Sequence, residues 1–193
     1  TATVTVTGKG NYTGTKSANF TISKAPTPTA PTAKTLTYTG SAQNLVNAGS
    51  TAVTWYYKVG TALTASNYST TGSTTIPTGT DANSYKVYYY TPGNSNYSAS
   101  AGSLYVTATI GAKSIAGSDI TITLGTTTYT YNGSAKQPAV TVKDTTRNVT
   151  LTSGTDYTVS YSNNTNAGTA TATVTGKGNY KDTKSANFTI SIA

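Results

Sequence analysis

The sequence contains no cysteine and no histidine, and these two absences remove several classes of site. Without cysteine the chain forms no disulfide and offers no thiolate to a metal ion. Without histidine it has no imidazole general base and lacks the commonest protein ligand of zinc and copper. We therefore predict no metal site and no cofactor.

Acidic side chains are also scarce, because the chain has five aspartates and no glutamate. Most of these aspartates stand beside turn residues, where Asp commonly stabilises the turn. A glycosidase needs two carboxylates that face one cleft at a defined separation, and one or two acids per repeat do not favour such a pair. We predict that the protein is not an enzyme. The aspartates are Asp81, Asp119, Asp144, Asp156 and Asp182.

Basic residues outnumber acidic ones, 13 against 5, which makes the net charge +8. They are spread singly along the chain and only one is arginine, whereas nucleic-acid-binding proteins concentrate charge on one element and use Arg to contact bases and phosphates. No apolar run approaches the ~20 residues that span a bilayer. This distribution predicts a solvated surface, no nucleic-acid partner and no membrane contact by this segment.

Threonine, serine, glycine, asparagine and tyrosine dominate what remains, and only 9% of the residues are charged. Threonine, valine and tyrosine suit pleated strands, and apolar residues alternate with polar ones over short runs. No stretch has the pattern of a long amphipathic helix. The sequence therefore predicts an all-β fold.

The two ends of the chain are nearly the same. Residues 1–23 and 169–191 align without a gap, and each reads as two alternating strands around a Gly-rich connection, which is typical of a β-hairpin. A duplicated hairpin predicts a tandem array of repeats. The three pairs that differ are Val4/Ala172, Thr13/Lys181 and Gly14/Asp182.

We divide the chain into four segments. Residues 1–25 form the C-terminal hairpin of a truncated repeat, and residues 26–31 form a Pro-rich linker, a composition that favours extended, semi-rigid backbone. Residues 32–109 and 110–193 form two further repeats of about 80 residues, with strands roughly every 8–12 residues. This spacing predicts small antiparallel β-sandwiches in tandem.

The first hairpin has one apolar row without an obvious partner. A two-stranded hairpin is marginally stable alone in water, and its unpaired edges attract other strands. We expect residues 1–25 either to dock on the second repeat or to pair with another copy of the chain. The apolar row consists of Ala2, Val4, Val6, Phe20 and Ile22.

The run DANSYKV, which begins at Asp81, resembles the start of strand F in immunoglobulin-like domains. In that family the tyrosine bonds back to the backbone and the residue two positions on enters the core. The resemblance assigns these roles to Tyr85 and Val87, and that of the core tryptophan of strand C to Trp55. In the third repeat Ala170 replaces the tyrosine.

As a whole the chain resembles the tandem Ig-like repeats of large surface proteins from Gram-positive and gut bacteria. The phrases that carry this are YNGSAKQP (131–138), LTSGTDY (151–157), SNNTNAG (162–168) and GKGNY (176–180). The middle repeat is similar to the related MBG-like type through IPTGTDA (76–82) and YKV (85–87). The resemblance implies an extracellular location on the bacterial cell surface and neighbouring repeats as partners.

Four tyrosines of the middle repeat are candidates for a ligand-binding surface. In an Ig-like sandwich strands C, F and G share one sheet, so their outward side chains meet on one face. Exposed aromatic platforms bind sugars or proteins, because a flat ring stacks at little cost in entropy. Alternatively, the rings form cross-strand pairs that stabilise the sheet, or the linker covers them. The candidates are Tyr56, Tyr88, Tyr90 and Tyr105.

We therefore expect a non-catalytic stalk or spacer segment of a bacterial surface protein, of the adhesin type. Rigid β-modules joined by short linkers would maintain reach, and exposed Thr and Ser would keep the surface soluble. The alternative is a module that binds a glycan or a host surface protein through the tyrosines of the middle repeat.

Overall fold

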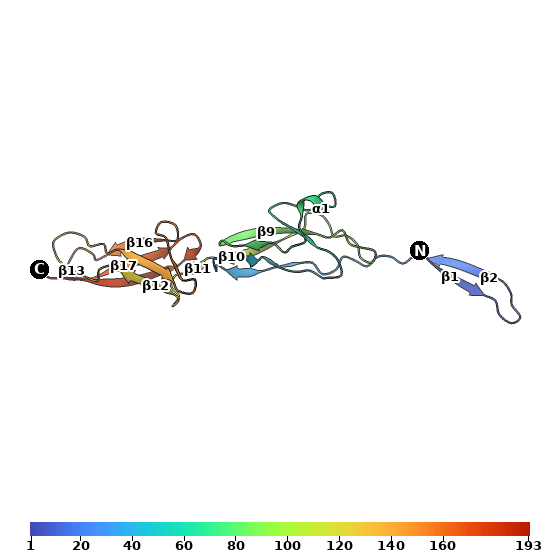
Figure 1. The fold of residues 1–193 in the computed structure, drawn as a ribbon, viewed down its shortest axis with the longest axis horizontal. Helices are drawn as coiled ribbons and strands as arrows, with labels where there is room; N and C mark the ends of the chain where they lie inside the picture. Colours follow the sequence, from blue (N-terminus) through green and yellow to red (C-terminus); the bar gives the residue numbers. More distant parts are fainter.

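The computed structural model describes all 193 residues and is almost entirely β-structure. Its one helix, α1 (Tyr68–Thr71), has four residues, and no helix is long and apolar enough to cross a bilayer. The predicted all-β fold is confirmed. Figure 1 shows three parts in a line: a hairpin, a middle unit and a C-terminal unit.

The first 20 residues form the expected hairpin from β1 (Ala2–Thr7) and β2 (Thr15–Phe20), paired antiparallel. The hairpin points away from the rest of the molecule (Figure 1), and every residue of its strands except Ala2 is exposed. The expectation that it docks on the second repeat is wrong. The middle unit packs its own apolar side chains internally and leaves only Val59 and Tyr105 exposed among the large ones. It therefore offers no bare apolar face, and pairing with another copy stays a prediction.

The proline-rich segment does not act as a separate spacer. It follows the surface of the middle unit, where Ala25 forms a bridge with Tyr97. The hydroxyl of Thr27 donates to the carbonyl oxygen of Ala99 at 2.8 Å, and the carbonyl of Thr29 accepts from the amide of Ser50 at 2.8 Å. The connection that stands clear of both parts is instead residues 21–24, which are all exposed.

A four-stranded sheet forms the main layer of the middle unit, in the order β4-β10-β9-β7, with β4 parallel to β10 and the other pairs antiparallel. Two short pairs, β3-β6 and β5-β8, complete the unit. The last strand continues to Gly111, two residues beyond the expected boundary. The strands are β3 (Thr32–Ala33), β4 (Thr35–Thr37), β5 (Gln43–Asn44), β6 (Val46–Asn47), β7 (Tyr56–Val59), β8 (Thr78–Gly79), β9 (Asn83–Tyr90) and β10 (Tyr105–Gly111).

The C-terminal unit has a four-stranded sheet of the same pattern, β13-β19-β17-β16, in which β13 is parallel to β19 and the other pairs are antiparallel. A second sheet, β12-β14-β15, and the pair β11-β18 complete it. The strands are β11 (Lys113–Ser114), β12 (Ile120–Leu124), β13 (Thr128–Thr130), β14 (Val140–Asp144), β15 (Val149–Thr150), β16 (Tyr157–Ser162), β17 (Gly168–Gly176), β18 (Tyr180–Lys181) and β19 (Thr183–Ser191).

The start of β9 has the expected corner geometry. The hydroxyl of Tyr85 donates to the carbonyl oxygen of Asp81 at 2.8 Å, and Val87 is fully buried. Trp55 is also buried, meets Tyr89 edge-on with 5.7 Å between ring centroids, and donates its indole N–H to the carbonyl of Ser50. The local roles expected for Tyr85, Val87 and Trp55 are confirmed.

Candidate functional site

The four candidate tyrosines do share one face of the middle sheet. Tyr56 on β7 lies opposite Tyr90 on β9, and Tyr105 on β10 lies opposite Tyr88 on β9. Residues directly opposite each other in an antiparallel pair project to the same side, and Tyr88 and Tyr90 are two positions apart on one strand. Register therefore brings together side chains from three strands that are distant in sequence.

Tyr90 is nevertheless buried, with 4% of its surface exposed, so its expected exposure is wrong. Helix α1 folds back over this part of the face and places the ring of Tyr68 between its neighbours, 4.8 Å from the Tyr56 centroid and 5.1 Å from the Tyr90 centroid. Asn67 holds the segment in place, since its side chain accepts from the amide of Thr64 at 2.7 Å. A four-residue helix is too short to show helical periodicity, so the sequence carried no usable signal for this cover.

The open part of the face is the pair Tyr88 and Tyr105. Their ring centroids are 5.4 Å apart with an interplanar angle of 54°, and Tyr105 is 48% exposed. The ammonium group of Lys86 lies 3.9 Å from the Tyr105 centroid and 5.4 Å from the Tyr88 centroid, a cation–π arrangement. The side-chain interaction with Tyr88, aided by Tyr105, raises the pKa of Lys86. A stacking ligand would have to displace this cation.

No hollow of the surface includes any of the four tyrosines. The largest, about 470 Å³, is lined by residues 163–169, which form the loop before β17 and the start of that strand. Another, about 440 Å³, lies beside β7 and is lined by residues such as Lys58, Ile76 and Pro77. The tyrosine face is therefore flat, and it can stack against a partner but cannot enclose a small molecule.

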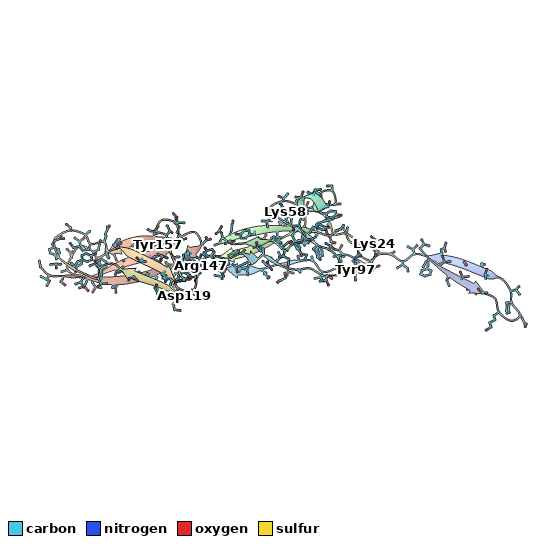
Figure 2. The ribbon with its side chains drawn as sticks, in the orientation of Figure 1. Lys24, Lys58, Tyr97, Asp119, Arg147 and Tyr157 are labelled. Atoms are coloured by element: carbon cyan, nitrogen blue, oxygen red, sulfur yellow. The ribbon has the colours of Figure 1, made fainter.

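A second group of polar side chains lies in the C-terminal unit near the middle unit, where Figure 2 labels Asp119 and Arg147. Lys113 stands between two carboxylates, 2.6 Å from Asp119 and 2.8 Å from the fully buried Asp144. Asp144 also accepts from the Tyr180 hydroxyl at 3.1 Å and from the amide of Arg147 at 3.2 Å. The buried charge is thus paired and fully hydrogen-bonded.

The pKa shifts in this group favour the charged forms of Lys113 and Asp119. Although partial burial acts in the opposite direction, the hydrogen bonds to Asp119 and Asp144 raise the pKa of Lys113. The same contact with Lys113 lowers the pKa of Asp119. A lysine nucleophile or a carboxylic general acid needs the opposite shifts. The arrangement is suited to structural ion pairing.

The same group continues across the boundary between the two units. The guanidinium of Arg147 lies 4.9 Å from the ring centroid of Tyr38 in the middle unit, and the Tyr180 ring meets that tyrosine edge-on at 5.6 Å. Gly40 lies against the guanidinium so closely that a Cβ would collide with it. The only arginine of the chain is therefore packed between the two units.

Asn179 forms a second bridge across this boundary. Its side-chain oxygen accepts from the amide of Ala82 at 2.7 Å, and its NH₂ group donates to the carboxylate of Asp81 at 3.0 Å. Sequence reasoning assigned Asp81 and Asn179 to separate turns. Because partners almost 100 positions apart share no local pattern, nothing in the sequence indicated that these residues meet.

Comparisons of this chain with protein-family models, with curated proteins and with solved structures each find no match.

Proposed function

We propose that this chain is a non-catalytic stalk or spacer segment, an array of Ig-like β-sandwich repeats in a bacterial surface protein. The strand order of the main sheet supports the Ig-like assignment. In both units three antiparallel strands and one parallel edge strand follow one another across the sheet in the same spatial order. The tyrosine corner at Tyr85 and the core tryptophan Trp55 support it further. On this view the chain maintains distance and displays a functional domain located elsewhere.

The observation that carries the proposal is the joint between the middle and C-terminal units. One continuous cluster of buried apolar residues extends from Tyr38 and Ile110 on one side to Ile115 and Tyr180 on the other. Polar contacts across the joint are added by the Arg147 guanidinium, which lies over the ring of Tyr38, and by the Asn179 side chain, which bonds to Asp81 and Ala82. A joint that combines apolar packing with several directional contacts resists bending, whereas a joint without contacts behaves as a flexible tether.

Distance measurements between spin labels test this role. The chain contains no cysteine, so Thr70→Cys and Ser134→Cys introduce one unique label in each unit, both at exposed positions. We expect a single narrow distance distribution across the joint. Arg147→Ala should broaden it, while Lys143→Ala, which removes an exposed cation outside the joint, should leave it unchanged.

Labels at Lys9→Cys and Thr70→Cys provide the internal comparison, because the exposed residues 21–24 lie between them. Here we expect a broad distribution. A broad distribution across the joint of the unmodified protein would contradict the stalk proposal, since a segment that bends freely there does not maintain reach.

A second candidate function is binding of a glycan or a host protein by the middle unit, and the exposure of Tyr105 favours it. The open surface is limited to Tyr88, Tyr105 and the half-buried Tyr56, since Tyr90 is covered. Exposed rings of this kind supply stacking area to a sugar or a protein loop.

A glycan array probed with the whole chain separates the two functions. A pure spacer binds no glycan on the array. Binding through the tyrosine face would be lost in Tyr105→Ser and retained in Tyr131→Ser, which removes an exposed tyrosine of the C-terminal unit. Equal loss in both variants would contradict a site on the middle sheet.

A further inference from the structure

The N-terminal hairpin has the internal structure of the C-terminal one. In β1 and β2 the pairs are Ala2↔Phe20, Val4↔Ala18 and Val6↔Lys16, and a shift of 168 residues converts each into a pair of β17 and β19. The cross-strand hydrogen bonds are also repeated. Thr3 donates to Asn19 as Thr171 donates to Asn187, at 2.8 and 3.1 Å. The free hairpin is thus already in the conformation that the C-terminal unit uses.

In the C-terminal unit four strands surround β17 and β19, and β11 pairs with β18 in the connection between them. Strand β16 pairs along the outer edge of β17, and β13 pairs along the outer edge of β19. The sheet that contains β12 and β14 supplies Leu124 and Val140 against the apolar face, while Tyr129 lies edge-on to Phe188 at 5.8 Å. The hairpin therefore fits a specific acceptor: two strand edges and one apolar layer.

The same surfaces are bare on the N-terminal hairpin. Phe20 is 51% exposed where Phe188 is 2% exposed, and Val6 is 65% exposed where Val174 is fully buried. A shallow hollow lined by Val4, Val6 and Ala18 marks this face. Both outer strand edges are unpaired, since β1 and β2 pair only with each other.

The Gly-rich connections of the two hairpins carry the same lysine and tyrosine. In the C-terminal unit the Tyr180 hydroxyl reaches the buried Asp144, and the ammonium of Lys177 donates to the carbonyl of Gly154 at 2.7 Å. The corresponding residues of the first hairpin are Tyr12 and Lys9, both exposed. Their hydrogen-bonding groups have no protein partner, so the acceptor would satisfy them as well.

We propose that the N-terminal hairpin is an interaction surface for an open repeat of this same kind, and that its partner is the acceptor formed by residues 110–167 of a second copy. The hairpin of one chain would occupy the place of β17 to β19 in the other. Because the hairpin and the C-terminal unit lie at opposite ends of the molecule (Figure 1), this contact joins copies head to tail. The intact acceptor is filled by its own hairpin, so the contact requires that hairpin to be displaced.

One substitution sets the selectivity of this contact. Val4 stands where the acceptor holds the fully buried Ala172. Extra methyl groups in a close-packed core force neighbouring side chains to shift. We therefore expect the chain's own hairpin to hold the acceptor more tightly than the N-terminal one, which keeps intact copies apart.

The test weakens the resident hairpin in the full-length chain. Phe188→Ser with Ile190→Ser removes two buried apolar anchors from it and leaves residues 1–25 unchanged. We expect this variant to form head-to-tail oligomers in sedimentation velocity, with an average mass that at least doubles as concentration rises. The matched control adds Phe20→Ser and Ile22→Ser, which should return the protein to a monomer.

Two results would overturn the proposal: a variant that stays monomeric, or a control that associates as strongly. If the weakened unit simply unfolds, a graft decides the question. Ala172→Val, Lys181→Thr and Asp182→Gly give the C-terminal hairpin the sequence of the N-terminal one. Cooperative unfolding of the grafted unit supports the fit, and its loss would show that the acceptor rejects this hairpin.

Discussion

The hairpins at the two ends of this protein share their sequence and their register, yet one is bare and the other lies in a packed core. Residues 1–23 and 169–191 differ at three positions, and none of these explains the contrast. Phe20 and Phe188 are identical side chains in identical pairs, with 51% and 2% of their surface exposed. Strand pairing is therefore a local property here, whereas burial depends on which strands surround the hairpin.

This difference has a direct energetic consequence. Complete burial of a large apolar side chain contributes about 1.5–3 kcal/mol, and a substitution in a packed site adds the cost of the cavity. The same change should therefore alter the stability of the protein at one end and leave it unaffected at the other. Paired substitutions measure this contrast directly.

The largest contrast is expected at the phenylalanines. Phe188→Ala should lower the free energy of unfolding of the C-terminal unit by about 3–5 kcal/mol, because it leaves a cavity between Tyr129 and Tyr161. Phe20→Ala should change it by less than about 0.5 kcal/mol, as exposed substitutions usually do. Urea unfolding followed by circular dichroism measures both. Equal effects would mean that the N-terminal hairpin is covered in solution.

The tyrosines of the two Gly-rich connections give the next contrast. Tyr180→Phe removes a hydroxyl that donates to the buried Asp144 and accepts from Arg147 at 2.5 Å. A hydrogen bond to a charged group contributes about 1.5–3 kcal/mol, so we expect a loss of this size in urea unfolding. Tyr12→Phe should have no measurable effect, because that side chain is 79% exposed. A similar loss in both variants would contradict the assignment.

The position where the hairpins differ in volume gives a third contrast. Ala172→Val adds two methyl groups to a site with no exposed surface, and we expect overpacking to cost about 1–3 kcal/mol. Val4→Ala, the reverse change at the bare end, should leave the thermal unfolding midpoint unchanged. If Ala172→Val instead stabilises the unit, the site has spare volume and the selectivity inferred for the two hairpins is absent.

The pH dependence of unfolding gives a fourth contrast. Burial, only partly offset by the hydrogen bond with Arg147, raises the pKa of Tyr180 to about 12 in the folded protein, against about 10 for an unperturbed tyrosine. The folded state therefore favours the protonated hydroxyl. This contribution is complete below pH 10 and is lost as the pH rises from about 10 to about 12.

Unfolding measured at pH 9 and pH 11.5 should thus show a steeper loss of stability in the unmodified protein than in Tyr180→Phe. Tyr12→Phe serves as the control and should follow the unmodified protein. Parallel curves for all three proteins would show that Tyr180 does not titrate as its burial requires.

Several features were predictable from the sequence because their causes are local. Alternation of apolar and polar residues identified the strands, and the run DANSYKV placed the hydroxyl of Tyr85 on the backbone of Asp81 and Val87 in the core. Alternation together with the strand neighbours that the Ig-like resemblance implies placed four tyrosines on one face, and the observed register agrees. Side chains along a strand change face at every residue, so a two-residue alternation of apolar and polar residues fixes the face on which each side chain lies.

Other features depended on segments that meet only in three dimensions. The alternation along β9 places Tyr90 on the face expected to be exposed. It is buried instead, because Tyr68 from a four-residue helix covers it. The joint between the units depends on Arg147 and Asn179, whose partners are distant in the chain. No periodicity links such residues, so sequence reasoning found neither the cover nor the joint.

The sequence by itself determined the β-structure, the repetition and the internal register of both terminal hairpins, because hydrogen bonding within a hairpin and the alternation of its side chains need no other part of the molecule. Only the tertiary structure decided which hairpin has a buried face. An apolar side chain is buried by its neighbours, and β12, β13, β14 and β16 surround Phe188, whereas no strand of the chain lies against Phe20.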